Sequence, residues 1–181
     1  PPTASNPADI NVQCLADVPA ANPNVVTDEA DNCGTPTVTF VSQTADPVNN
    51  DGTITRTYLV DDGNGNTINV FQDIVIDDTT DPNTPVLADV NVGQCSGTPP
   101  TPTTTDNCAG TINGTTSTTF PITTQGTTVV TWTFDDGNGN SINVNQNVIV
   151  DDTTDPNTPV LADVNVGQCS GTPPTPTTTD N

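Results

Sequence analysis

The hydrophobic positions of this chain recur with a period of two rather than the 3.6 of a helix. Apolar and polar residues alternate through 54–60 and 68–76, and again through 128–134 and 142–150. Such alternation is typical of β-strands that bury one face. The two segments of each pair are joined by the loop DDGNGN, whose Asn-Gly steps accept positive φ at low cost. The pattern therefore predicts β-hairpins in an all-β protein.

A long internal repeat divides the chain into modules. Residues 77–107 and 151–181 are identical in sequence, with an offset of 74, and a more diverged copy begins with ADINVQC at Ala8. Self-similarity of this kind is the signature of a repeat architecture. The sequence predicts two whole modules and the start of a third, which is truncated or completed by a neighbouring subunit: residues 1–78, 79–152 and 153–181.

The charge balance excludes several classes of function. The chain has one basic side chain, no histidine and 22 acids, for a formal net charge of −21. Nucleic acids and anionic membrane surfaces are not expected partners, because they need clustered Lys and Arg. No apolar run approaches 18 residues, so we expect no membrane insertion. Only carboxylates remain for acid and base chemistry, and we predict that the protein is not an enzyme. Arg56 is expected to pair with an acid at the edge of the core.

Five cysteines are expected to support a thin hydrophobic core. Small modules with few large apolar side chains usually need disulfides, metals or neighbours. Cys14 and Cys33 occupy places in the first module that match Cys95 and Cys108 in the second, so we predict a disulfide within each module, with Cys169 bonded to the next repeat. Each bond would contribute roughly 3 kcal/mol, and persistent disulfides indicate an extracellular setting. The alternative, a zinc site, would need close Cys pairs or His partners.

Three segments carry a resemblance to a known family. TASNPADINVQC, VVTDEADNCGTPTV and TITRTYLVDDGNGNTINV are similar to hyalin-repeat modules, which occur in tandem in secreted bacterial surface proteins. The resemblance covers essentially the whole chain. It implies tandem immunoglobulin-like β-sandwich domains and a role in adhesion or cell-surface architecture. Related repeats often have a second disulfide, but this sequence has Val48–Asp51 and Gly63 at the positions of its cysteines. We therefore expect another stabiliser, such as a metal, at the end of the module where that disulfide would be.

The acidic loops are the candidate metal site. If the strands follow the immunoglobulin order, the DDGNGN hairpin and the Asp-Asn-Cys loop lie at the same end of the domain. The acidic linker, residues 77–81, enters the second module at that end. Oxygen ligands at this density suit calcium, which takes six to eight of them, so we predict calcium at each junction. The alternative is plain solvated turns, since no EF-hand or nonapeptide motif is present. The candidate ligands are Asp28, Glu29, Asp31, Asn32, Asp61, Asp62 and Asn64 in the first module; Asp77, Asp78, Asp81, Asp106, Asn107, Asp135, Asp136, Asn138 and Asn140 around the second; and Asp151, Asp152 and Asp155 leading into the third.

These features favour a secreted structural or adhesive protein that forms a calcium-stiffened rod or filament. Its partner would be itself, in a continuous array or end to end, with surface glycans or other cells as further candidates. The alternative is a ligand- or carbohydrate-binding adhesion module on a larger surface protein, which would need exposed aromatic side chains. The sequence offers no plausible set of catalytic residues for a hydrolase. Asp61 and Asp62 are adjacent in a turn, so they cannot lie on either side of a glycosidic bond as the two carboxylates of a glycosidase do.

Overall fold

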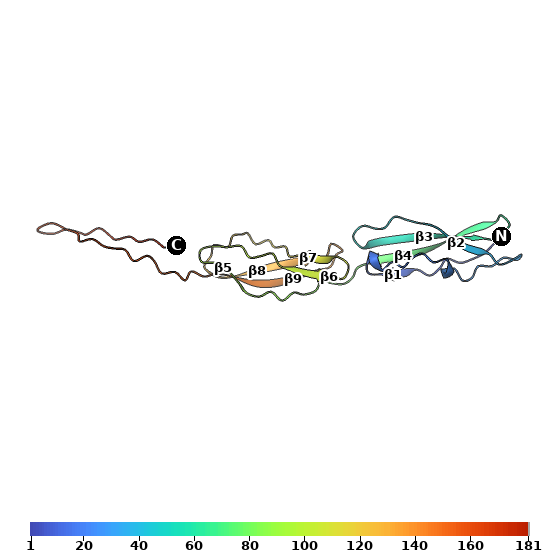
Figure 1. Cartoon of the computed structure of the whole chain (residues 1–181), viewed down its shortest axis with the longest axis horizontal. Coiled ribbons are helices and arrows are strands. Elements are labelled where there is room, and N and C mark those ends of the chain that lie inside the picture. Colours follow the sequence, from blue (N-terminus) through green and yellow to red (C-terminus); the bar gives the residue numbers. More distant parts are fainter. Residues whose placement is uncertain (181) are drawn as a thin grey trace. The chain divides into compact units, whose positions relative to one another are not determined.

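The structure, a computed structural model, describes residues 1–180, and its regular secondary structure consists almost entirely of β-strands joined by long loops (Figure 1). Two short 3-10 helices, η1 (Leu15–Asp17) and η2 (Pro23–Val25), are the only helical turns among these residues. Within the described range, no helix is long and apolar enough to cross a bilayer. The all-β prediction is confirmed. Asn181, the end of the predicted third module, lies outside the described residues.

The chain forms two compact units, and neither is one continuous stretch of sequence. The first unit contains residues 1–86, 101–115 and 132–144, and the second contains 87–100, 116–131 and the residues from 145 onward. The module boundaries expected from the repeat stay a prediction.

A four-stranded sheet dominates the first unit, in the order β1-β4-β3-β2. The hairpin of β3 (Asp51–Asp61) and β4 (Thr67–Asp77) runs in antiparallel register from Asp51 opposite Asp77 to Asp61 opposite Thr67. Strand β2 (Thr37–Gln43) pairs antiparallel with β3, and β1 (Ile10–Val12) pairs parallel with β4. The hairpin expected from the alternation at 54–60 and 68–76 is therefore present.

The core of this sheet lies on the face where the period-two pattern places its apolar residues. Tyr58 is fully buried and packs with Val26, Val60 and Val70. A second cluster contains Ile54, Ile74 and Ile76, which are covered by partly buried residues of β1 and of the segment after it. The pole at which β1 and β4 end is thus held to the sheet by apolar contacts.

Arg56 also faces this core. The expectation that it pairs with an acid is wrong, because the acceptors of its hydrogen bonds are neutral. Its side chain is 3 % exposed. The guanidinium donates from Nη2 to the carbonyl oxygen of Pro19 and from Nε to Gln43 Oε1 at 3.2 Å. The reason is that β2 and the segment after η1 bring neutral oxygens to this position.

The second half of the chain forms a three-stranded sheet and a separate hairpin. The sheet has the order β5-β9-β8, with β5 (Val90–Gly93) parallel to β9 (Ser141–Val150) and β8 (Gly126–Asp135) beside β9. Strands β6 (Thr103–Asp106) and β7 (Gly110–Asn113) pair with each other. The inward positions of β8 and β9 are buried: Val130, Trp132, Phe134, Val148 and Val150.

Residues 151–180 contain no strand, although they repeat the sequence of 77–106. A local hydrogen bond is conserved between the two copies, since Asn157 N–H donates to Thr179 O at 3.0 Å and Asn83 N–H donates to Thr105 O at 3.0 Å. The two copies differ in strand pairing. Strand β5 lies against β9, whereas the described residues include no strand beside 164–167.

Candidate metal centre

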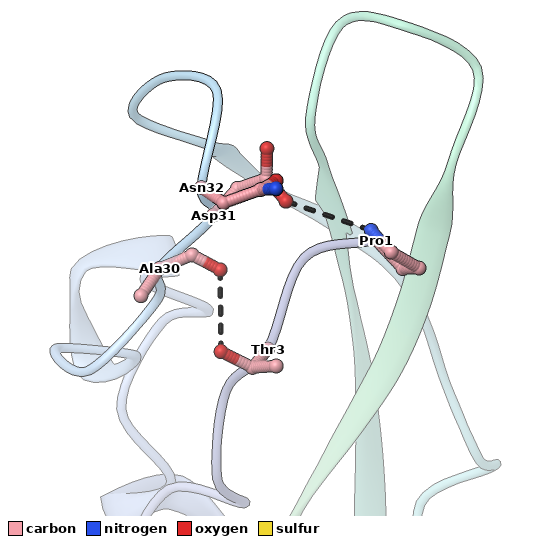
Figure 2. Close-up of a pocket in the computed structure, with 5 residues that line it drawn as sticks. All are labelled: Pro1, Thr3, Ala30, Asp31 and Asn32. Carbon is pink, nitrogen blue, oxygen red and sulfur yellow. Dashed lines mark hydrogen bonds and ion pairs between the residues drawn. The ribbon is translucent and has the colours of Figure 1, made fainter.

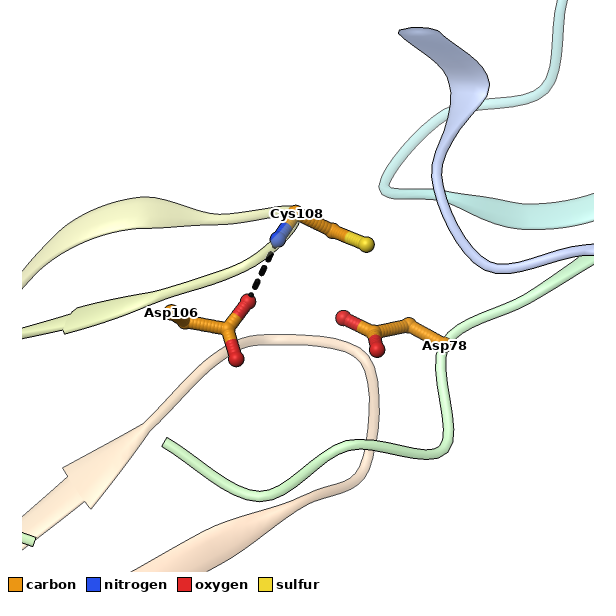
Figure 3. Close-up of side chains that lie close together, drawn as sticks. All are labelled: Asp78, Asp106 and Cys108. Atoms are coloured by element: carbon orange, nitrogen blue, oxygen red, sulfur yellow. Dashed lines mark hydrogen bonds between the residues drawn. The ribbon is translucent and has the colours of Figure 1, made fainter. Parts of the chain in front are cut away.

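Three carboxylates of the first unit are buried in what we call the acidic cluster. Asp78 follows β4, Asp106 ends β6 and Asp136 follows β8, and their exposed fractions are 3, 8 and 9 %. Carboxylate oxygens of Asp78 and Asp106 and the sulfur of Cys108 all lie within 4.8 Å of one another (Figure 3). Three acidic segments that are distant in sequence, the linker and two loops, therefore meet here.

The DDGNGN loop is shaped around Asp136. Oδ1 of Asp136 accepts the N–H groups of Asn138 at 2.8 Å and Asn140 at 3.1 Å, and Oδ2 accepts the Asn140 side-chain amide at 2.8 Å. Burial alone would raise the pKa of Asp136, but the hydrogen bonds from Asn140 and Asn138 outweigh it, so that the pKa is lowered from 3.8. Asp136 is therefore held as a carboxylate at neutral pH.

Side-chain amides of the two loops hold the linker in place. Asp78 accepts from the Nδ2 atoms of Asn138 at 3.3 Å and Asn107 at 3.4 Å through its carboxylate. Its backbone carbonyl accepts from Asn140 Nδ2 at 2.9 Å. The carboxylate of Asp78 also accepts the N–H of Thr80 at 3.2 Å, which bends the linker over the cluster.

Gln13 fixes the same linker from the side of the first sheet. Its Oε1 accepts the Thr80 hydroxyl at 2.8 Å and the Thr79 N–H at 3.3 Å, and its Nε2 donates to Thr79 Oγ1 at 3.0 Å. Because Thr79 and Thr80 directly follow Asp78, these bonds restrict where that carboxylate can lie.

Two oxygens of the cluster are buried and lack a hydrogen-bond donor among residues 1–180: Asp106 Oδ2 and Asn138 Oδ1. The other oxygen of Asp106 accepts the N–H groups of Cys108 and Ala109, both at 2.8 Å. A buried carboxylate without compensation is costly. Arg56 is the one basic side chain in the sequence, and it is bonded to Pro19 and Gln43. No basic side chain of this protein is therefore at hand to neutralise the cluster.

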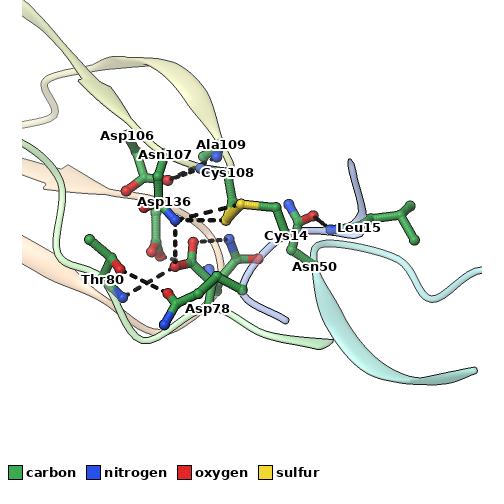
Figure 4. Close-up of a disulfide and its surroundings, with 12 residues drawn as sticks. Cys14, Leu15, Asn50, Asp78, Thr80, Asp106, Asn107, Cys108, Ala109 and Asp136 are labelled. Carbon is green, nitrogen blue, oxygen red and sulfur yellow. Dashed lines mark hydrogen bonds between the residues drawn. A yellow bond between two sulfur atoms is a disulfide. The ribbon is translucent and has the colours of Figure 1, made fainter. Parts of the chain in front are cut away.

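A disulfide between Cys14 and Cys108 borders the cluster (Figure 4). The side-chain amide of Asn107 lies between the two, 3.5 Å from Cys14 Sγ and 2.9 Å from Cys108 Sγ. Cys108 is thus a disulfide sulfur rather than a thiolate ligand, and the remaining donors are oxygens. In the chain-entropy model, closing a loop with a sequence separation of 94 contributes about 4.7 kcal/mol to stability.

The disulfides predicted within modules, Cys14 with Cys33 and Cys95 with Cys108, are wrong as pairings. Strand β1 is parallel to β4, so Cys14 emerges where β4 ends at Asp77. Cys33 precedes β2, whose Thr37 pairs with Asp61 at the other end of β3. The 11 residues of β3 separate these ends by roughly 35 Å, whereas bonded cysteines have Cα atoms less than about 7 Å apart. Cys33 and Cys169 are exposed.

The opposite end of the first sheet repeats part of this arrangement. Asp31 has a side chain that is 4 % exposed; its Oδ2 accepts the N–H of Cys33 at 3.0 Å, and its Oδ1 lies 3.6 Å from the Pro1 amine. Pro1 and Asp31 line a pocket together with Thr3, Ala30 and Asn32 (Figure 2). Asp62 accepts from Asn64 N–H at 2.7 Å and from the Asn66 side chain at 2.6 Å, as Asp136 does from its loop, and its pKa is lowered by these bonds.

The structure distributes the predicted ligands unequally. It brings Asp78, Asp106, Asn107, Asp136, Asn138 and Asn140 together. Asp28 lies outside the acidic cluster, and both of its carboxylate oxygens accept the Ser5 N–H, at 3.0 and 3.1 Å. Glu29 has one buried oxygen with no hydrogen bond within the described residues. Asp61 and Asp135 accept from the glycine two residues on. The rest are exposed and lie outside the acidic cluster: Asn32, Asn64, Asp77, Asp81, Asp151, Asp152 and Asp155.

A comparison with protein families agrees with the resemblance carried by the first module. Residues 2–76 match the family described as the HYR-like domain with 4 cysteines. Residues 2–76 are an HYR-like module. HYR-like modules are typical of extracellular proteins of the adhesion type, and this one contains two cysteines, Cys14 and Cys33. No curated protein matches the chain.

Proposed function

We propose that this protein is a structural or adhesive extracellular repeat protein whose acidic cluster binds calcium and stiffens the connection between successive immunoglobulin-like modules of a rod or filament. The observation that carries the proposal is the pair of buried oxygens without donors, Asp106 Oδ2 and Asn138 Oδ1, beside the buried carboxylate of Asp78. The HYR-like module supports the extracellular setting.

The donor set favours calcium over other cations. Asp78 and Asp106 supply carboxylates, Asn138 supplies an amide oxygen, and Asp136 adds negative charge next to them. Hard oxygen donors of this kind bind calcium, while zinc sites use His and thiolate ligands. Calcium sites of extracellular modules have dissociation constants of about 0.1–1 mM. A cation here would join the linker after β4 to the loops after β6 and β8.

The same chemistry supports a binding role rather than catalysis. Asp136 receives three hydrogen bonds that stabilise its charged form, which suits an electrostatic role and opposes proton transfer near neutral pH. The sequence offers no His or Lys to act as a partner base or nucleophile. We therefore include a non-enzymatic role in the proposal.

The proposal is tested by thermal unfolding of the oxidised chain in chelator and in millimolar calcium. In 10 mM calcium, which is about 10 to 100 times these dissociation constants, calcium would stabilise the folded state by about 1.4–2.7 kcal/mol and raise Tm by roughly 3–11 °C. In Asp106→Asn we expect two changes of opposite sign. Tm in chelator stays equal or rises, because a buried uncompensated charge is removed, and the increase with calcium is lost.

Asp135→Asn is the matched control, because Asp135 is the exposed neighbour of Asp136 in the same loop. It should keep the full response to calcium. If wild type gains no stability from calcium, or if Asp106→Asn responds as wild type does, the proposed site is wrong and the acidic loops are solvated turns.

A further inference from the structure

The Cys14–Cys108 disulfide changes which residues can carry tension. A force applied to the two ends of the chain is transmitted through covalent bonds, and this bond connects residues with a sequence separation of 94. Strands β2, β3, β4, β5 and β6 and the linker after β4 all lie between the two cysteines. Tension that enters at residues 1–13 therefore passes from Cys14 directly to Cys108 and onward to β7.

We propose that this disulfide is a covalent bypass that protects strands β2, β3 and β4 of the HYR-like module and the linker after β4 from mechanical extension, while β1, which precedes Cys14, remains under load. Residues 15–107 form a closed loop, so their unfolding adds no length to a chain under load. Only residues 1–13 and those after Cys108 can lengthen. The bypass does not depend on a bound cation, whereas its biological meaning rests on the proposed structural role.

The bypass also shields two of the three carboxylates of the acidic cluster. Asp78 and Asp106 both lie inside the closed loop, and Cys108 is bonded two residues after Asp106. A pull on the chain ends therefore cannot draw the linker away from the end of β6. Asp136 and Asn138 lie outside the loop, but they are tied to Asp78 by the Asn138 and Asn140 amides. Asp78 and Asp106 are thus spared the direct load, whereas Asn138 belongs to the loaded segment after Cys108.

Single-molecule force spectroscopy on the full chain, with handles at both ends, tests the bypass through the fully extended length. At about 3.3–3.6 Å per residue, the reduced 181-residue chain extends to roughly 600 Å, and the oxidised chain should be shorter by about 320 Å. Disulfides within modules, Cys14 with Cys33 and Cys95 with Cys108, would shorten it by only about 110 Å. Extended length does not depend on how well a variant folds.

Two variants assign the shortening to the bond. Oxidised Cys14→Ser should recover the full length, and oxidised Cys33→Ser should keep the shortening of about 320 Å. Any other shortening in the oxidised wild type, including none, overturns the proposal. Repeating the measurement in calcium and in chelator separates the two ideas, because the length is independent of calcium while the stability of the acidic cluster is not.

Discussion

At the scale of single residues, neighbouring acids of the same loop have different roles. Asp135 is exposed and completes a turn with Gly137, while Asp136 is buried and organises the whole DDGNGN loop. The sequence predicts that both belong to one acidic pole but cannot distinguish them, because which side chain turns inward depends on the strand register before the loop. The buried oxygens of Asp106 and Asn138 depend likewise on tertiary packing.

Asp28 gives a prediction for the pH dependence of stability. Hydrogen bonds from the side chain and the backbone N–H of Ser5 lower the pKa of Asp28 from 3.8. A carboxyl with a lowered folded pKa stabilises the protein above its unfolded value and loses that contribution as the pH falls through the folded value. The carboxyl resonance of Asp28 should therefore titrate below pH 3.8 in the folded protein. Titration at the ordinary value would contradict this account.

A variant provides the check in terms of stability. Asp28→Asn should reduce stability at neutral pH and converge with wild type in unfolding experiments as the pH falls below 3.8. A difference from wild type that stays constant down to pH 2 would show that the carboxylate charge of Asp28 does not matter.

At the scale of elements, the hairpins are predictable from alternation, but the pairing of short strands is not. Strand β5 and residues 164–167 have the same sequence, VNVG, and only β5 is a strand. Four residues have little intrinsic preference, so the free edge of β9 determines the outcome. The same pairing explains the wrong disulfides, because the parallel partner of β1 decides at which end of the sheet Cys14 emerges.

The identical segments predict different hydrogen exchange. Amides of 90–93 that bond to β9 should exchange markedly more slowly than their counterparts in 164–167, which should exchange near the intrinsic rate. The identical local sequence makes the intrinsic rates equal, and NMR can separate the two sets of resonances. Equal protection in the two segments would contradict the difference in pairing.

The hydrogen bonds from Gln13 to Thr79 and Thr80, which we call the Gln13 clamp, predict a change in calcium affinity on mutation. Gln13→Ala removes three hydrogen bonds next to Asp78 and should weaken calcium binding by roughly 5–10-fold, which corresponds to about 1 kcal/mol, measured by calorimetry. The matched control is Gln94→Ala, since Gln94 bonds the hydroxyl of Thr154, the counterpart of Thr80, away from the acidic cluster. If both variants weaken binding equally, the clamp is not specific to the cluster.

At the scale of the whole molecule, the most consequential feature is one that spacing alone did not predict, the bond between distant cysteines. It can be checked chemically, because Arg56 is the one site for trypsin in the sequence and lies between Cys14 and Cys108. Cleavage of the unfolded, alkylated and unreduced chain should give a single band on a non-reducing gel and two fragments after reduction. Pairs within modules would release two fragments without reduction.

The same disulfide also affects what proteolysis does to the chain. The described disulfide links residues on both sides of a stretch that includes strands β2, β3 and β4 and the linker after β4, so a single cut anywhere between Cys14 and Cys108 does not sever the protein. Hydrogen bonding and burial keep the cut ends close to their native places. A secreted chain of this design would tolerate nicks and remain one covalent piece.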